Sequence, residues 1–90
     1  MLYMVVETFK TPGALDVYRR ARERGRLLPE GLEYISSWVD FDFTRCFQVM
    51  KTDREDLLKE WVNHWSDLVD FEIVPVQTSS EAAEKIRPRL

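Results

Sequence analysis

The chain has 90 residues, a length that fits one domain burying somewhat more than about 60% of its unfolded surface. A charged content of 32% and a net charge of -3 provide no basic field that would attract nucleic acid or an anionic membrane. No apolar run approaches the roughly 20 residues of a membrane span, and the first residues lack the basic leader of a signal peptide. A single cysteine excludes disulfides and cysteine-built metal sites, so we expect a cytoplasmic protein.

The first third of the chain predicts a strand followed by a helix. Residues 2–9 are apolar on both faces, as in a strand that is covered on both sides, and Glu7 interrupts this pattern. Thr11 then fits a helix cap and Pro12 a first helical turn. Arginines crowd the end of the helix and Gly25 fits its C-terminal stop. The positions expected to face the core are Ala14, Leu15, Tyr18, Ala21 and Gly25.

Residues 33–50 predict a β-hairpin, because two runs rich in β-branched and aromatic residues flank Asp40-Phe41-Asp42. If these three residues form the loop, Val39 lies opposite Phe43 and Ser36 lies opposite Cys46. A slip of one residue in the loop would exchange the partners on one strand. In the predicted register one face carries Ile35, Val39, Phe43, Phe47 and Val49, with Ser37 and Arg45 among them. The other face carries Leu32, Tyr34, Ser36, Trp38, Thr44, Cys46, Gln48 and Met50.

The second half predicts a helix, a strand and a short final helix. Thr52 and Glu55 have the spacing of a capping box. The apolar stripe that follows at helical spacing is expected to face the core and consists of Leu57, Leu58, Trp61, Val62, Trp65, Leu68 and Val69. Residues 69–77 predict a strand, and Pro75, which cannot donate to a ladder, places that strand at an edge of the sheet. Thr78 and Glu81 then fit the cap of a C-terminal helix of about residues 79–87.

This order of elements predicts one α+β domain over residues 1–90. Its class is a ferredoxin-like βαββαβ sandwich with the antiparallel sheet order 4-1-3-2 and two helices on one face. An uncovered apolar sheet face would exceed the few hundred Å² that a monomer normally exposes. We therefore expect a homodimer, a dimeric α+β barrel with the sheets face to face. The residues expected on the open face are Tyr3, Val5, Tyr34, Trp38, Cys46, Met50, Val74 and Val76.

Several strings of the sequence resemble a small bacterial family of single-domain proteins that is catalogued as a domain of unknown function. The most specific are Thr44-Arg45-Cys46-Phe47-Gln48 and Trp65-Ser66-Asp67-Leu68, and residues 1–7, 25–32 and 37–40 extend the resemblance over nearly the whole chain. The resemblance implies a ferredoxin-like fold and membership among the dimeric α+β barrels. That superfamily includes cofactor-free monooxygenases, lactone isomerases, haem-binding enzymes and ligand-sensing domains, so the resemblance implies no reaction.

The predicted ligand site is a cavity between the two sheets of the dimer. Aromatic walls with a few polar groups are typical of small-molecule sites, but dimer interfaces use the same residue types, and the interface is the favoured interpretation. Arg45 would clamp a carboxylate or an enolate, or else pair with Asp40 or Asp42 near the turn. The residues assigned to this site are Tyr3, Tyr34, Trp38, Arg45, Cys46 and Gln48.

The weak candidates for catalysis are His64, Glu7 and Arg45. His64 could act as a general base or an axial haem ligand, although a structural role is commoner, and a single histidine argues against a zinc or iron site. Glu7 could transfer protons if it faces the cavity. Cys46, next to Arg45, could be a nucleophile, but a small buried apolar role is favoured.

The function favoured by the sequence is that of a small dimer. It is expected to bind a small, partly apolar molecule, which could be either neutral or anionic. No cofactor, metal, nucleic acid or membrane is expected as a partner. Two alternatives stay open: a cofactor-independent monooxygenase or isomerase that uses the same cavity, and a structural or interaction domain with no site.

Overall fold

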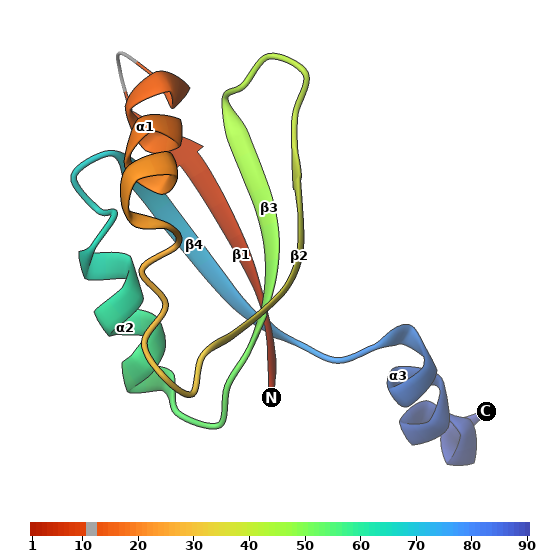
Figure 1. Cartoon of the computed structure of the whole chain (residues 1–90). Helices are drawn as coiled ribbons and strands as arrows, with labels where there is room; N and C mark the ends of the chain where they lie inside the picture. The colour runs from red at the N-terminus through yellow and green to blue at the C-terminus, as the bar shows by residue number, and fades with distance from the viewer. Residues whose placement is uncertain (11–12) are drawn as a thin grey trace.

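The computed structural model describes residues 1–10 and 13–90. Within these residues four strands and three α-helices follow one another along the chain, and a short 3-10 turn, Arg87–Arg89, comes last. The elements, labelled in Figure 1, are β1 Leu2–Phe9, α1 Ala14–Arg24, β2 Glu33–Val39, β3 Arg45–Lys51, α2 Glu55–Asn63, β4 Val69–Val76 and α3 Ser79–Ile86.

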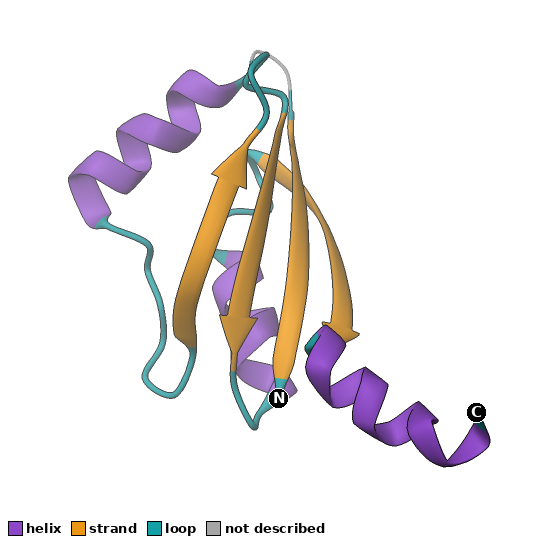
Figure 2. Cartoon of the chain, turned by 90° about the vertical axis from the view of Figure 1, so that its right-hand side faces the viewer, coloured by secondary structure: helices purple, strands orange, loops and turns teal. Residues whose placement is uncertain are grey.

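The strands form one antiparallel sheet in the order β2-β3-β1-β4, which confirms the predicted order. Helices α1 and α2 lie on the same side of the sheet (Figures 1 and 2), so the domain is the predicted ferredoxin-like α+β sandwich. Strand β4 is at an edge, as Pro75 requires, and Pro75 lies opposite Tyr3 of β1.

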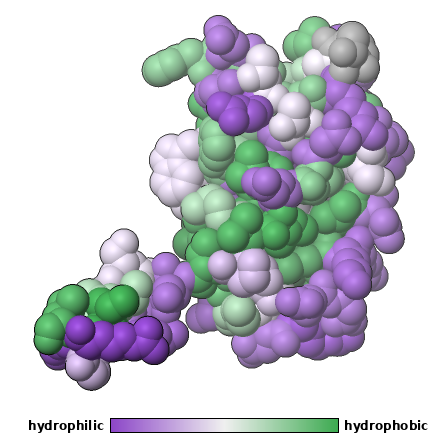
Figure 3. Space-filling view, turned by 180° about the vertical axis from the view of Figure 1, so that it is seen from behind, coloured by the Kyte–Doolittle hydropathy of each residue, from purple (hydrophilic) through white to green (hydrophobic). Residues whose placement is uncertain are grey.

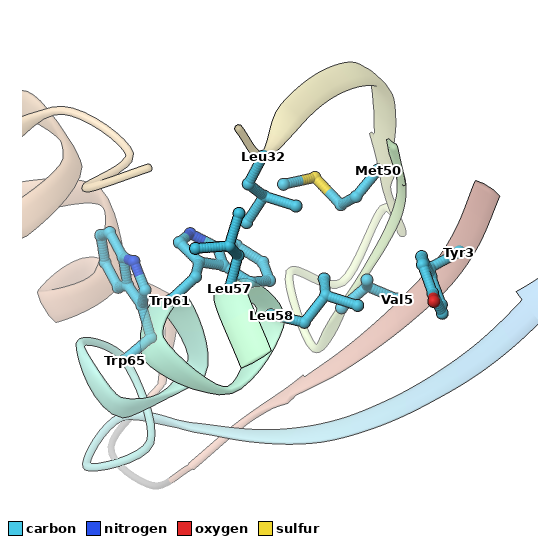
Figure 4. Close-up of a cluster of buried hydrophobic side chains, with 8 residues drawn as sticks. All are labelled: Tyr3, Val5, Leu32, Met50, Leu57, Leu58, Trp61 and Trp65. Carbon is cyan, nitrogen blue, oxygen red and sulfur yellow. The ribbon is translucent and has the colours of Figure 1, made fainter. Parts of the chain in front are cut away.

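The core lies between α2 and the sheet. Alternate residues of β1 point to this side, and Tyr3, Val5 and Glu7 are all buried. From the helical layer Leu57, Leu58 and Trp61 of α2 meet them, together with Trp65 in the turn that follows (Figure 4). Leu32 and Met50 complete the buried apolar cluster.

The predicted hairpin register is wrong. Val39 pairs with Cys46 and Trp38 pairs with Phe47, so the loop spans residues 40–44 instead of 40–42. Asp40 closes this longer loop, because its Oδ1 accepts the backbone amides of Thr44 at 2.7 Å and Arg45 at 3.0 Å. A carboxylate that accepts two backbone amides stabilises the wider turn over the tighter one that the sequence pattern favours.

The helices cover the opposite face of the sheet from the one that the sequence predicts, and the corrected register separates Trp38 from Cys46. Cys46 and Met50 lie on the covered side with Glu7 and Tyr3, their partners on β1. Tyr34 packs against the core as well, since a bulge between Tyr34 and Ser36 shifts the register within β2. Of the residues expected on the open face, Tyr3, Val5, Tyr34, Cys46 and Met50 are therefore wrongly assigned, whereas Trp38, Val74 and Val76 lie there.

The helix ends follow the predictions in part. Gly25 does end α1, with φ 70° and its amide donating to the Ala21 carbonyl at 2.8 Å. The capping box predicted at Thr52 does not form, because Thr52 Oγ1 accepts the amide of Arg54 at 3.1 Å and α2 begins later, at Glu55. The box predicted at Thr78 and Glu81 does form. The start assigned to Thr11 and Pro12 lies outside the described residues.

Helix α3 leaves the body of the domain. It lies on the other side of the sheet from α1 and α2 and projects beyond the strand ends (Figures 1 and 2). None of the residues Ser79–Ile86 is buried. Among the described residues, no helix has both the length and the apolar character needed to cross a membrane.

Candidate functional site

A cavity of about 420 Å³ opens between α1, α2 and the covered face of the sheet. Its volume is within the range of small-molecule sites, and its walls combine aromatic and aliphatic side chains with a few polar groups, as such sites do. The lining residues are Glu7, Phe9, Val17, Tyr18, Ala21, Gly25, Arg26, Ser37, Val39, Cys46, Gln48, Trp61 and Trp65.

Glu7 is the buried acid of this cavity, with 7% of its surface exposed. Strand alternation turns it toward the helices, and the Nε2 of Gln48 donates to its Oε2 at 3.0 Å. Burial raises the pKa of Glu7 to about 7, and the Cys46 hydrogen bond and the Arg26 charge offset this only in part. The carboxyl group is thus able to gain and lose a proton near neutral pH.

Arg26 orients the amide that holds Glu7. Its Nη1 donates to the Oε1 of Gln48 at 2.7 Å. Because arginine only donates, the Gln48 oxygen must face Arg26, which leaves the amide nitrogen for Glu7. The guanidinium also lies 3.6 Å from the centre of the Tyr34 ring. Arg26, Gln48 and Glu7 form one chain of hydrogen bonds from the exposed side of the domain to the cavity.

The backbone of Arg26 is fixed by the aromatic wall. Its carbonyl accepts the indole Nε1–H of Trp61 at 3.0 Å and that of Trp65 at 3.1 Å. The two tryptophans are one helical turn apart, which lets both indoles reach the same oxygen. They are the core residues that the sequence predicts, and they are also part of the cavity wall.

Cys46 is half-buried beside Glu7, and this position argues against the nucleophile considered from the sequence. Burial raises the pKa of its thiol to about 12, with the Glu7 charge and hydrogen bond adding to the effect. The thiol therefore stays protonated at neutral pH and donates to the carboxylate, the weakly reactive role favoured from the sequence.

An aromatic pair, of which only Tyr18 lines the cavity, joins α1 to the hairpin loop. Tyr18 of α1 and Phe43 of the hairpin loop meet edge to face, with ring centres 6.3 Å apart. Both are partly exposed, and Tyr18 lines the cavity. Burial, together with the nearby Cys46 and Glu7, raises the pKa of the Tyr18 hydroxyl, so it remains a hydrogen-bond donor.

The structure divides the predicted ligand residues among three places. Cys46 and Gln48 line the cavity, and Tyr34 supports it through Arg26 and a 2.7 Å hydrogen bond to Ser37. Tyr3 belongs to the core, with its hydroxyl 3.4 Å from Glu55 Oε1.

Trp38 and Arg45 do not join this group. Both lie on the open face of the sheet, where the Arg45 guanidinium is 5.1 Å from the centre of the Phe47 ring. Arg45 meets Asp40 through its backbone amide. The set therefore does not line a single inter-sheet cavity, and the enclosed space lies on the covered face.

Of the catalytic candidates, Glu7 alone lies on the described cavity wall. His64 is exposed at the end of α2, and its backbone carbonyl accepts Arg20 Nη1 at 2.7 Å. Arg20 also donates to both carboxylate oxygens of Asp67, at 2.8 and 2.7 Å, which joins α1 to the turn that follows α2. Within the described residues, no three His, Cys, Asp or Glu side chains are grouped to hold a metal ion.

Sequence reasoning missed Arg26 and the cavity roles of Tyr18, Trp61 and Trp65. Arg26 is hard to select because it is one of several arginines around the end of α1. The position of Arg26 could have distinguished it from the other arginines. Arg26 comes after Gly25, which ends the helix, so its side chain is not bound to the solvent-facing side of α1 as those of the helical arginines are.

The strand order, the helix placement and the internal cavity define a small ferredoxin-like α+β domain with a buried acid at the cavity wall. No curated protein and no solved structure is significantly similar to the chain. A family model described as Domain of unknown function (DUF3303) matches residues 1–90, and the chain belongs to that family.

Proposed function

We propose that the domain binds a small, partly apolar molecule in the cavity between α1, α2 and the sheet. The observation that carries the proposal is Glu7, a buried carboxyl group at the wall of a largely apolar cavity. A carboxylate can accept about four hydrogen bonds, and the bonds from Gln48 and Cys46 use about half of this capacity. A bound molecule can donate to the remainder.

The chemistry around Glu7 selects the polar group of that molecule. Above pH 7 the buried carboxylate repels an anion and accepts from a hydroxyl or an amide, so the proposed ligand is a neutral aromatic or aliphatic donor. This replaces the anionic ligand that Arg45 would have clamped. Trp61, Trp65 and Tyr18 supply apolar contact for its hydrocarbon part.

Phenol and fluorobenzene test this proposal, since they are similar in size and only phenol donates. The indole N–H resonances of Trp61 and Trp65 report on the cavity in a titration followed by NMR. Phenol should bind at least about fivefold more tightly than fluorobenzene, which corresponds to the binding free energy of about 1 kcal/mol expected of one hydrogen bond. Glu7→Gln should reduce that preference and Glu30→Gln should not. Equal binding of the two probes, or no binding, contradicts the proposal and favours the domain without a site.

A proton-transfer enzyme is the second candidate, and the pKa of Glu7 near 7 favours it. A general base is most effective when its pKa lies near the working pH. The sequence left the proton transfers to either His64 or Glu7. Glu7 is the better candidate for the base, because His64 lies away from the described cavity wall. Loss of deuterium from α-deuterated cyclohexanone in water, followed by mass spectrometry, tests it. If the wild-type protein and Glu7→Gln release deuterium at the same rate, the domain is not a proton-transfer enzyme that uses Glu7.

We also propose that two copies pair through the open sheet face. The centre of that face is apolar, since Met4 lies in register with Val49 on one side and Val74 on the other. Hydrophobic residues gather across it in Figure 3. An apolar surface of this kind is typical of a subunit interface. The apolar residues of the open face are Leu2, Met4, Val6, Ile35, Trp38, Phe47, Val49, Val74 and Val76, and the charged residues Arg45, Lys51, Asp70 and Glu72 share the face with them.

Sedimentation at micromolar concentration tests the pairing. The intact chain should sediment with the mass of two copies, and Met4→Asp should sediment as one copy. Thr8→Asp is the matched control, because Thr8 is on the same face of the same strand at its polar end, between Arg45 and Asp70. A wild-type chain with the mass of one copy contradicts the pairing.

A further inference from the structure

The guanidinium of Arg26 lies beside the polar groups of the cavity. Its Nη1 donates to the Oε1 of Gln48 at 2.7 Å, and both residues line the cavity. The Arg26 charge acts to lower the pKa of Glu7 and that of Cys46, against the larger effect of burial, as expected of a cation close to both groups. Arg26 is therefore a second charged group of the site that contains Glu7.

The Arg26 side chain is oriented without using most of its donors. The guanidinium lies over the Tyr34 ring, 3.6 Å from its centre, and the Tyr34 hydroxyl is hydrogen-bonded to Ser37 at 2.7 Å. Stacking occupies a face of the guanidinium, whereas its five N–H donors point outward in its plane. Among the described residues, Gln48 is the only hydrogen-bond partner of this side chain. Further N–H groups are thus available to a ligand.

Arg26 is anchored at both ends of the residue. Its carbonyl accepts the indole N–H groups of Trp61 and Trp65. Its guanidinium contacts Tyr34 and Gln48. A donor that is ordered before a ligand arrives loses less conformational entropy on binding. The residue as a whole is exposed, so its donors are accessible to a molecule that enters from solvent.

Glu7 and Arg26 lie close together because both bond to the side-chain amide of Gln48. The hydrogen bond to Glu7 is 3.0 Å long and that from Arg26 is 2.7 Å long. Since the oxygen and nitrogen of an amide are about 2.2 Å apart, Glu7 Oε2 and Arg26 Nη1 are at most about 8 Å apart. A ligand that bonds to both groups has a donor and an acceptor at a spacing that a single aromatic ring provides.

The charges of the two groups favour a neutral acceptor. Above pH 7 the Glu7 carboxylate balances the Arg26 guanidinium. An anion bound by Arg26 would add an unbalanced negative charge close to Glu7, which is costly in a buried site. A carbonyl oxygen accepts from the guanidinium without adding a charge.

We propose that Arg26 is the second polar anchor of the cavity, and that the ligand pairs a hydroxyl group bound by Glu7 with a carbonyl group bound by Arg26. The inference rests on the proposed binding function and narrows the ligand to a neutral hydroxy-carbonyl compound whose two groups lie about one ring apart. Trp61 and Trp65 supply apolar contact for the ring between them.

Two phenols of nearly equal shape, 3-acetylphenol and 3-isopropylphenol, test the inference, because only the acetyl group accepts a hydrogen bond. At about pH 7.5 both hydroxyls are protonated, since phenols titrate well above that pH. 3-Acetylphenol should bind at least about fivefold more tightly, as measured by NMR titration of the Trp61 and Trp65 indole N–H resonances. Arg26→Met removes the donors and should abolish this preference. Arg24→Met, at an exposed position in the last turn of α1, is the matched control and should keep it.

The acetyl group also makes the phenol a stronger donor, and Arg26→Met separates the two effects. A preference that persists in this variant comes from the donor strength at Glu7 and overturns the contact with Arg26. The variant should still bind phenol more tightly than fluorobenzene. Loss of that preference as well would show that Arg26 acts only through Gln48, which also overturns the contact.

The wild-type protein distinguishes this inference from the proposed function. If it prefers phenol to fluorobenzene but binds 3-acetylphenol no more tightly than 3-isopropylphenol, the inference is wrong and the proposed function stands. If it binds none of the four probes, both are wrong.

Discussion

The Nε2 of Gln48 donates a hydrogen bond of 3.0 Å to the Oε2 of Glu7, across the pair of central strands β3 and β1. Strand alternation puts this carboxyl group on the covered face of the sheet, where an apolar residue would otherwise pack. Burying an acid is costly unless its acceptors are satisfied. The group is therefore held at a cost to stability, which is the arrangement expected of a functional residue rather than a packing one.

Glu7→Gln should make the domain more stable at pH 8 and leave it nearly unchanged at pH 5. The pKa of Glu7 is raised in the folded state, to about 7 from a usual 4.5, so its stabilising contribution is complete below pH 4.5. That contribution is lost as the pH rises toward 7. The shift corresponds to a gain on the order of 3 kcal/mol for the neutral amide at pH 8. Urea unfolding at pH 5 and pH 8 measures the free energy of unfolding of both proteins. If the difference between Glu7→Gln and wild type is the same at both pH values, the prediction is wrong.

Gln48→Met should raise the pKa of Glu7 further. The substitution removes the amide that donates to the carboxylate and cuts the link to Arg26, so the charged form loses its stabilisation while burial persists. An NMR titration of the Glu7 side-chain carbon gives the pKa directly. Arg26→Gln should act in the same direction, because the Arg26 charge lowers the pKa of Glu7, and Arg24→Gln, at an exposed position of α1, serves as the control. A lower Glu7 pKa in Gln48→Met would rule out this role for the amide.

Cys46 should react slowly with iodoacetamide at pH 8. A thiol pKa of about 12 leaves roughly a thousandfold less thiolate than an ordinary cysteine with a pKa near 8.5 to 9. Because the Glu7 charge is one cause of that pKa, Glu7→Gln should speed the alkylation. The rate for the unfolded chain in urea is the reference. A folded rate as fast as the unfolded one would show that the thiolate is accessible and not suppressed.

The sequence predicts the fold because local signals agree with one another. Pro75 excludes β4 from the centre of the sheet, and Gly25 and Thr78 mark helix ends that the structure confirms. The spacing of Trp61 and Trp65 identifies a core-facing pair that is indeed buried. Each of these signals acts over a few residues, which is the range over which sequence determines structure directly.

The site is harder to predict because it depends on which face of the sheet is covered. Strand β1 is apolar on both faces, so alternation alone does not say whether Glu7 turns toward the helices or away from them. The hairpin has the same ambiguity, and an odd change of register moves Cys46 and Gln48 relative to their β2 neighbours. Arg26 reaches Gln48 from a loop far away in sequence, a contact that only the assembled fold provides.

Asp40→Ala should lower the thermal midpoint of unfolding by several degrees and loosen the hairpin register. The carboxylate of Asp40 accepts the amides of Thr44 and Arg45, and these bonds set the loop length that brings Val39 opposite Cys46. They also lower the pKa of Asp40, so the stability that they contribute is present above its usual pKa of 3.8 and is lost as the pH falls through the lower folded value. Asp40→Asn keeps one acceptor oxygen and should be intermediate. Cross-strand amide contacts between Val39 and Cys46 in NMR spectra report the register, and their persistence in Asp40→Ala would show that the loop is set by other contacts.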